Sequence, residues 1–296
     1  MRRSVAAQRR RDAGWFLAPL LVALLIVAGW PLARTIWLSF TDASLAGGAH
    51  GFVGLENYAF LTEDPDWWRA VRNTLVFASV SVALETALGL GIALVLDAQI
   101  RGRGLLRAAV LVPWAIPTVV SAQLWAWMLH DQYGVINEML LTLGVIEAPQ
   151  AWLADRTLAM ASVIAVDVWK TTPFMVLLLL AALQTVPVEL HEAAQVDGAG
   201  AIRRFMVVTL PVIRPALLVA VIFRSLDALR IFDLIYVMVG NASATATMAV
   251  YARQHMVDFQ DAGYGSAAST LLFAVIALAT ALFITLGRVT APPAAR

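Results

Sequence analysis

Six long apolar stretches, separated by polar loops, constrain the fold of this chain more than any other feature. About 20 apolar residues in a helix cross the hydrocarbon core of a bilayer, and every stretch reaches that length. Only 14% of the residues are charged, against about 25% in soluble domains. We therefore predict an all-α membrane protein with six transmembrane helices. The expected spans cover about 14–38, 71–96, 106–128, 157–183, 211–239 and 265–286.

The first apolar stretch follows five arginines among the first eleven residues, an arrangement that also occurs in signal peptides. However, it is long enough to span a membrane, and it ends near Trp30 and Trp37 rather than at a small-residue cleavage site. We expect an uncleaved first span with these tryptophans at the far interface. Residues 1–13 then form a basic N-terminus, 14–288 the six-span domain, and 289–296 a C-terminal tail.

The distribution of positive residues predicts the orientation, since six spans place both termini on one side. Of the 21 Lys and Arg residues, five precede the first stretch, three lie in the 97–107 loop, three lie between 189 and 214, and two end the chain. The opposite loops hold five, and three are embedded. Because positive residues stay inside, the termini and the loop over 189–210 are expected to be cytoplasmic.

The chain lacks the residues that most enzymes and cofactor sites require. It has no cysteine, and its four histidines are scattered without metal-ligand spacing. Lys170, the single lysine, follows Trp169 within a span, so no phosphate-binding loop can be built. No nucleophile, base and orienting group stand together, and the basic residues are too dispersed to bind nucleic acid. We expect a non-enzymatic protein that binds no metal or cofactor.

The loop over 189–210 combines an acidic, small-residue half with a basic, aromatic half. Glu192 begins a helical turn, Asp197–Ala199 interrupt it around a glycine, and Arg203–Met206 form a short amphipathic piece before Leu210. A helix–turn–helix at a membrane surface has the shape of a segment that docks into another protein.

This loop resembles a known motif. Glu192-Ala193-Ala194, Gly198 after three more residues, and Leu210-Pro211 further on match the EAA loop of permease subunits in binding-protein-dependent ABC importers. Val208 stands where that family usually has Ile. Asp197, Ala199, Phe205 and Pro215 also fit the sugar-importer form. The segment 52–58 resembles one that is common after the first span of sugar permeases. The segments 168–175 and 223–240 are similar to those of maltose- and trehalose-type permeases, actinobacterial trehalose importers especially.

The resemblance implies the type I ABC importer permease fold, with the EAA loop as a cytoplasmic coupling helix. It also implies a multi-pass subunit of the bacterial plasma membrane that imports a disaccharide such as trehalose or maltose; glycerol-phosphate or another glycoside remains an alternative. The implied partners are a second homologous permease, an ATPase homodimer that carries ATP and Mg²⁺, and an extracytoplasmic sugar-binding protein or lipoprotein. The residues expected to couple to the ATPase are Glu192, Ala193, Ala194, Asp197, Gly198, Ala199, Phe205 and Pro211.

Four embedded charges, Arg224, Asp227, Arg230 and Asp233, recur every third residue in the fifth stretch. Opposite charges at this spacing can pair along a helix. They form either a self-neutralising ladder that holds the helix to its neighbours or a polar lining for the translocation path. Both arrangements satisfy the rule that charges within membranes face the bundle interior or water. Asp227, near mid-span, is the member that we expect to touch the path.

The fourth stretch holds a similar pair, Asp167 and Lys170, beside two aromatic residues, Trp169 and Phe174, that could stack on a sugar ring. Glu85 is alone in the second stretch, and we expect it to bond to a neighbouring helix. Glu85, Asp167, Lys170 and Trp169 are all candidates for the substrate path.

A row formed by Glu85, Asp167 and Asp227 could instead relay protons in a secondary transporter. Such transporters often carry internal repeats in their two halves, and no convincing repeat is present here. The EAA-like loop would also be unexplained in that class.

Overall fold

A computed structural model describes residues 2–48, 50–98 and 102–290; most of the expected C-terminal tail lies outside these ranges. The described residues are helical apart from loops and two isolated bridges, Thr41–Phe52 and Ser44–Asp261. The predicted all-α class is confirmed. Within these ranges, five helices are long and apolar enough to cross a membrane, or six if one bent pair counts as a span. The chain divides into two compact units.

The first unit comprises Met1–Asp64 and Ala252–Leu271. Its helices are α1 (Arg2–Leu24), α2 (Trp30–Leu38), α3 (Glu56–Glu63) and the start of α14 (Ala262–Thr290), with π-helical turns at Leu25–Gly29 and Gln254–Asp258. Asn57 and Tyr58, part of the segment that resembles sugar permeases, have a structural role here. The Asn57 amide donates to the carbonyls of Ser39 and Thr41, at 3.0 and 2.9 Å, and Tyr58 bonds the Ser39 hydroxyl.

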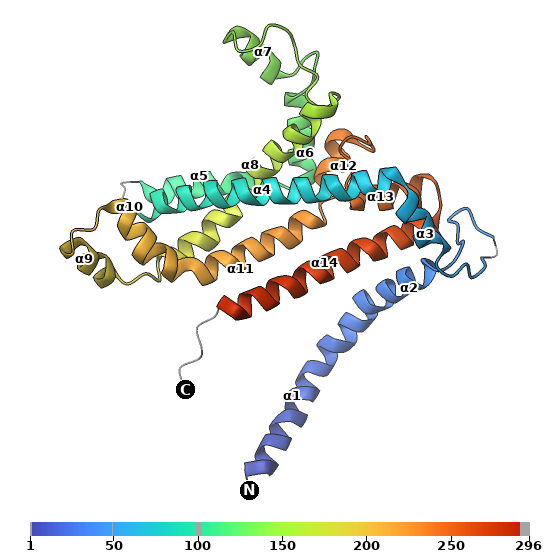
Figure 1. Cartoon of the computed structure of the whole chain (residues 1–296), viewed down its shortest axis with the longest axis horizontal. Helices are drawn as coiled ribbons and strands as arrows, with labels where there is room; N and C mark the ends of the chain where they lie inside the picture. The colour runs from blue at the N-terminus through green and yellow to red at the C-terminus, as the bar shows by residue number, and fades with distance from the viewer. Residues whose placement is uncertain (1, 49, 99–101, 291–296) are drawn as a thin grey trace. The chain divides into compact units, whose positions relative to one another are not determined.

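The second unit comprises Pro65–Tyr251 and Leu272–Arg296. Its long helices are α4 (Pro65–Asp97), α8 (Arg156–Leu183) and α11 (Leu210–Leu229), labelled in Figure 1. Helix α8 packs against α4, α5, α11 and α12 and is its central element. The shorter helices are α5 (Arg103–Ala115), α6 (Thr118–Met128), α7 (Val135–Thr142), α9 (Val188–Val196), α10 (Ala201–Arg204), α12 (Asp233–Val239) and α13 (Met248–Arg253). The last two residues of α13 belong to the first unit.

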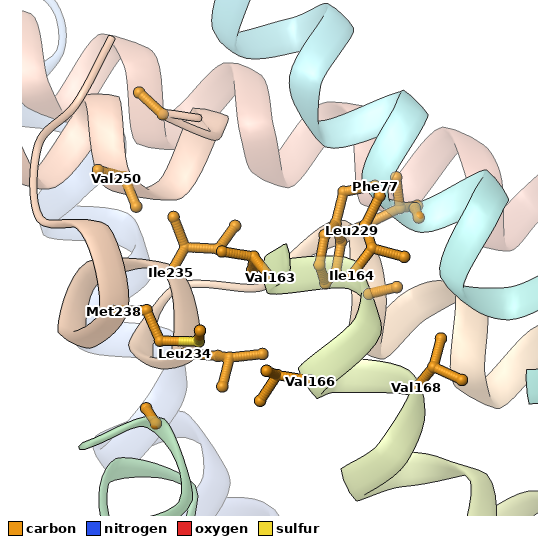
Figure 2. Packing of buried hydrophobic residues seen from close by; sticks show 14 of the residues in the cluster. Phe77, Val163, Ile164, Val166, Val168, Leu229, Leu234, Ile235, Met238 and Val250 are labelled. Carbon is orange, nitrogen blue, oxygen red and sulfur yellow. The ribbon is translucent and has the colours of Figure 1, made fainter. Parts of the chain in front are cut away.

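Buried aliphatic side chains form the core of this unit, where α8 faces α4, α11 and α12 (Figure 2). Phe77 of α4, Val163 of α8 and Leu234 and Ile235 of α12 are completely buried. Gly89 allows α4 to approach α8 closely, because an added Cβ would lie 2.7 Å from the Met175 Cβ.

Helix α8 begins at a side-chain cap. Asp155 Oδ1 accepts hydrogen bonds from the backbone N–H groups of Thr157 and Leu158, both at 2.8 Å. These two donors stabilise the ionised carboxylate and hold the pKa of Asp155 below its ordinary value. The cap fixes the start of the helix that carries Asp167 and Lys170.

The expected third span, about 106–128, is bent, as its internal prolines Pro113 and Pro117 predict. Helices α5 and α6 meet at 91°. Pro117 explains the break, because a proline disfavours helical angles at the residue before it. Ile116 is accordingly extended, with φ −76° and ψ 133°.

The residues of the expected fifth span, about 211–239, do not form a single helix. The continuous helix runs over Ala201–Leu229, including a π-helical turn at Phe205–Thr209, and therefore starts earlier and ends earlier than predicted. The helix is interrupted at Arg230–Phe232, and the next helix, α12, begins at Asp233. Neither proline nor glycine marks this break. A tertiary bond contributes instead, since the Thr247 hydroxyl donates to the carbonyl of Ile231 at 3.1 Å.

Candidate functional site

The loop between α8 and α11 has the predicted helix–turn–helix shape. Helix α9 ends at Val196, and Gly198 adopts φ +76°, a conformation that glycine tolerates best. Its N–H donates to the carbonyl of Gln195 at 3.0 Å. Arg204 of α10 donates to the Gln195 side chain at 2.9 Å and joins the two halves. The turn is therefore held by its own backbone and by one polar bridge.

Residues 189–210 of this loop, here called the coupling loop after its expected role, include several highly exposed side chains. Val196 is 88% exposed and Ile202 is 82% exposed. An added Cβ at Gly198 would meet no atom within 4 Å. The coupling candidates Glu192, Ala193 and Asp197 are exposed, as is Pro211, whereas Ala194, Ala199 and Phe205 are half-buried.

A second polar region, here called the charge cluster, consists of Arg224, Glu85, Asp167 and Asp227. The Arg224 guanidinium donates to Glu85 from Nε at 2.5 Å and from Nη2 at 2.9 Å, and it pairs with Asp167 through Nη2. Glu85, Asp167 and Arg224 are at most 2% exposed. Thr171 adds a hydrogen bond to Glu85 Oε1 at 2.5 Å. One cation thus joins α4, α8 and α11, as charge-assisted hydrogen bonds do where water is excluded.

Asp227 lies at the edge of the cluster. Its carboxylate contacts Arg224 Nη1 and Arg230 Nη2, each at 3.2 Å, and its side chain is 53% exposed. The predicted i, i+3 pairing is therefore present from Arg224 to Arg230. Asp233 falls on the next helix, so the four residues do not form one ladder.

Lys170 and Asp167 do not pair as predicted. Lys170 Nζ donates to the carbonyl of Ile116 at 3.0 Å, at the break between α5 and α6, whereas Asp167 binds Arg224. Within the described ranges no ion pair involves Lys170. Lys170 therefore supplies the hydrogen bond that the Ile116 carbonyl would receive from a backbone N–H in an unbroken helix.

Two adjoining hollows open beside the cluster, with volumes of about 480 and 260 Å³. Both are lined by Trp114, Thr171, Asp227 and Arg230. We call them together the polar cavity. The larger hollow is also lined by Thr118, Asp167, Lys170, Ile231, Phe232 and Asp233, and the smaller by Phe174, Phe223 and Arg224.

Comparisons with known proteins identify the class. The family described as "Binding-protein-dependent transport system inner membrane component" matches residues 85–290. The chain belongs to this family. It is thus a multi-span permease component of the inner membrane, as the EAA-like motif predicted.

Named relatives align with this permease over most of its length. It is 42% identical over 273 residues to the trehalose/maltose transport system permease protein MalF of Thermococcus litoralis, covering 92% of each chain. It is 40% identical to the trehalose transport system permease protein SugA of Mycobacterium tuberculosis, covering 96% of this chain and 91% of that one. The sulfoquinovosyl glycerol transport system permease protein SmoG of Agrobacterium fabrum is 39% identical, with 90% and 87% covered.

Solved structures show the same fold. A chain of a bacterial ABC transporter involved in the import of the acidic polysaccharide alginate matches with a TM-score of 0.85, covering 99% of this permease and 100% of that chain at 22% identity. The predicted ABC importer permease fold is confirmed.

All the charged residues that line the polar cavity were candidates from the sequence, whereas Trp114 and the Ile116 carbonyl that binds Lys170 were missed. Trp114 stacks with Phe174 at 6.2 Å between ring centroids, and Trp169 meets Trp125 edge to face at 5.3 Å. Trp169 does not line the described cavity. Pro113 and Pro117 in the third stretch were the available sequence signal for these two features. A kink at a proline turns the neighbouring backbone and side chains toward the bundle interior.

Proposed function

We propose that this permease forms half of the translocation path of an ATP-driven importer for a neutral disaccharide of the trehalose or maltose type. The polar cavity carries this proposal. It combines an aromatic face, Trp114, with carboxylate and guanidinium groups from Asp227 and Arg230. Sugar hydroxyls exchange hydrogen bonds with such groups, and the larger hollow, at about 480 Å³, has the size of an ordinary small-molecule site. The names of the trehalose-transporting relatives support the same cargo.

The charge balance of the cavity favours neutral cargo over phosphorylated or sulfonated glycosides. The polar cavity is lined by three carboxylates, Asp167, Asp227 and Asp233, and by three cations, Arg224, Lys170 and Arg230. Lys170 is already engaged with the carbonyl of Ile116. An anionic headgroup would find no excess positive charge here. Glycerol-phosphate and sulfonated sugars are therefore disfavoured as cargo.

The coupling loop is the proposed docking site for a separate ATPase. Its apolar residues Val196 and Ile202 are 88% and 82% exposed, and they are therefore available for contact with another protein. We infer that two ATPase copies bind ATP and Mg²⁺, and that this chain binds no cofactor. A second permease and an extracytoplasmic sugar-binding protein complete the assembly. The termini and the coupling loop lie on the cytoplasmic side in this arrangement, where ATP is available.

Co-purification from detergent-solubilised membranes tests the proposal. The tagged chain should recover a P-loop ATPase and a second permease, and the reconstituted complex with its binding protein should import trehalose only with ATP. Recovery of the chain alone, still driving uptake with a proton gradient and no ATP, would overturn it. Import of a phosphorylated glycoside in preference to trehalose would overturn the cargo assignment alone.

A further inference from the structure

Asp227 connects two different environments at the end of α11. One carboxylate oxygen, Oδ2, faces the buried Arg224, and the other, Oδ1, faces Arg230, whose side chain is 69% exposed. Asp227 also lines both hollows of the polar cavity. It is therefore the member of the charge cluster best placed to meet cargo in the cavity.

Arg224 holds Asp227 less closely than it holds Glu85. The Asp227 contact is 3.2 Å, whereas the two bonds to Glu85 are 2.5 and 2.9 Å. Glu85 is fully buried and cannot be released into water, because an unpaired buried charge is strongly unfavourable. Asp227 can be released, since it is half exposed and keeps Arg230 as a partner. A cargo hydroxyl that donates to Asp227 would compete with Arg224 for this carboxylate.

The cluster joins the two helices that lead into the coupling loop. Asp167 belongs to α8, which ends at Leu183 shortly before α9, and Arg224 belongs to the continuous helix that begins at Ala201. Glu85 ties both to α4. A change in the Arg224 contacts thus alters the attachment of both helices that carry the loop.

We propose that Asp227 is a positioning residue that couples cargo in the polar cavity to the coupling loop through Arg224 and its buried partners. This inference rests on the proposed function and adds the residue that communicates cargo binding to the ATPase. Cargo that binds Asp227 weakens the ion pair between Asp227 and Arg224. Arg224 is then paired with Glu85 and Asp167 alone. The two states differ in one contact at the cavity and in the packing of α8 against α11. By linkage, nucleotide-driven movement of the loop alters the affinity of the cavity for cargo.

A double-mutant cycle tests the coupling in the whole complex, reconstituted in nanodiscs with its binding protein and trehalose. The readout is the ratio of trehalose-stimulated to unstimulated ATPase turnover, together with the trehalose concentration giving half-maximal stimulation. D227N should reduce the ratio at least about fivefold, the lower range of typical allosteric coupling. E85Q should also reduce it. The double variant should resemble D227N alone, because both changes interrupt one route.

Asp233 provides the matched control. It lines the same cavity, but no ion pair joins it to Arg224 in the described part of the chain. D233N should raise the trehalose concentration that gives half-maximal stimulation. Its effect on the stimulation ratio should be independent of the effect of E85Q, so the two effects should multiply in the double variant. D227E should restore at least half of the wild-type ratio. E85D, which keeps the charge but withdraws the carboxylate, serves as the second cluster variant if E85Q does not assemble.

The outcomes separate the two claims. If the effects of D227N and E85Q multiply as those of D233N and E85Q do, the positioning role is wrong while the proposed function stands. A D227N complex with a wild-type ratio and only a raised half-maximal concentration would also overturn the inference. If the wild-type complex hydrolyses ATP but trehalose does not stimulate it, both the cargo assignment and the inference fail.

Discussion

The coupling loop and the charge cluster are both rich in polar residues, yet their surroundings are opposite. In the loop, Val196 and Ile202 are more than 80% exposed, and Gly198 has open space around it. In the cluster, Glu85 is completely buried and Arg224 makes contacts with three carboxylates. The cluster residues find their partners within this chain. Under the proposed function the exposed side chains of the loop contact another molecule, so the two regions should respond differently to substitution.

Removing the cluster cation should have the largest effect on stability. R224M leaves Glu85 and Asp167 buried without a positive partner, and breaking a buried ion pair in this way costs about 3–5 kcal/mol. The midpoint of thermal unfolding in detergent should fall sharply, and the yield of folded permease should fall with it.

R230M is the matched control for this change. Arg230 contacts the same Asp227, but its side chain is 69% exposed. Exposed ion pairs contribute about 0–1 kcal/mol, so R230M should unfold close to the wild-type temperature. Equal losses of stability for the two variants would show that burial does not distinguish the cluster from the cavity surface.

Tight packing behind the cluster should give the next largest effect. In G89A, the new Cβ would lie 2.7 Å from the Met175 Cβ, so α4 and α8 must separate. Overpacking of this kind costs about 1–3 kcal/mol. G91A, two residues away on the same helix, places its Cβ in open space and should be neutral or slightly stabilising. A G89A permease as stable as G91A would contradict the close approach of α4 and α8.

The two regions also differ in what the sequence could reveal. The coupling loop was predicted in shape because its signals are local: an acidic first turn, a glycine where φ is positive, and an amphipathic segment. The partners of Glu85 and Asp167 could not be predicted, because Arg224 is 139 residues from Glu85 and 57 from Asp167 along the chain. The break after Leu229 was missed for a similar reason, since no proline or glycine marks it and a tertiary bond from Thr247 contributes to it.

Substitution of Gly198 should separate strain from docking. G198V forces a β-branched residue into φ +76°, which costs about 1–2 kcal/mol. We expect normal membrane insertion, a modest loss of stability, and at least about a tenfold loss of ATP-driven uptake if the lost docking energy is about 1.4 kcal/mol.

Gly144 offers the control, because it has φ +66°, equally open surroundings, and a position after α7 rather than in the coupling loop. G144V should lose similar stability and keep its uptake. If both variants lose uptake equally, backbone strain rather than docking explains the effect of G198V.

The smallest change in stability is expected where the loop is most exposed. V196D replaces an apolar side chain that is 88% exposed, so the free energy of unfolding of the isolated permease should change by no more than about 0.5 kcal/mol. A charge in an apolar docking contact is unfavourable, however, and recovery of the ATPase should fall at least about fivefold, equivalent to about 1 kcal/mol.

V145D, at a residue that is 65% exposed beside α7, should leave recovery unchanged. Full recovery of the ATPase by V196D would place its docking surface elsewhere. A large loss of permease stability would instead show that Val196 packs within this chain, and the contrast between loop and cluster would then disappear.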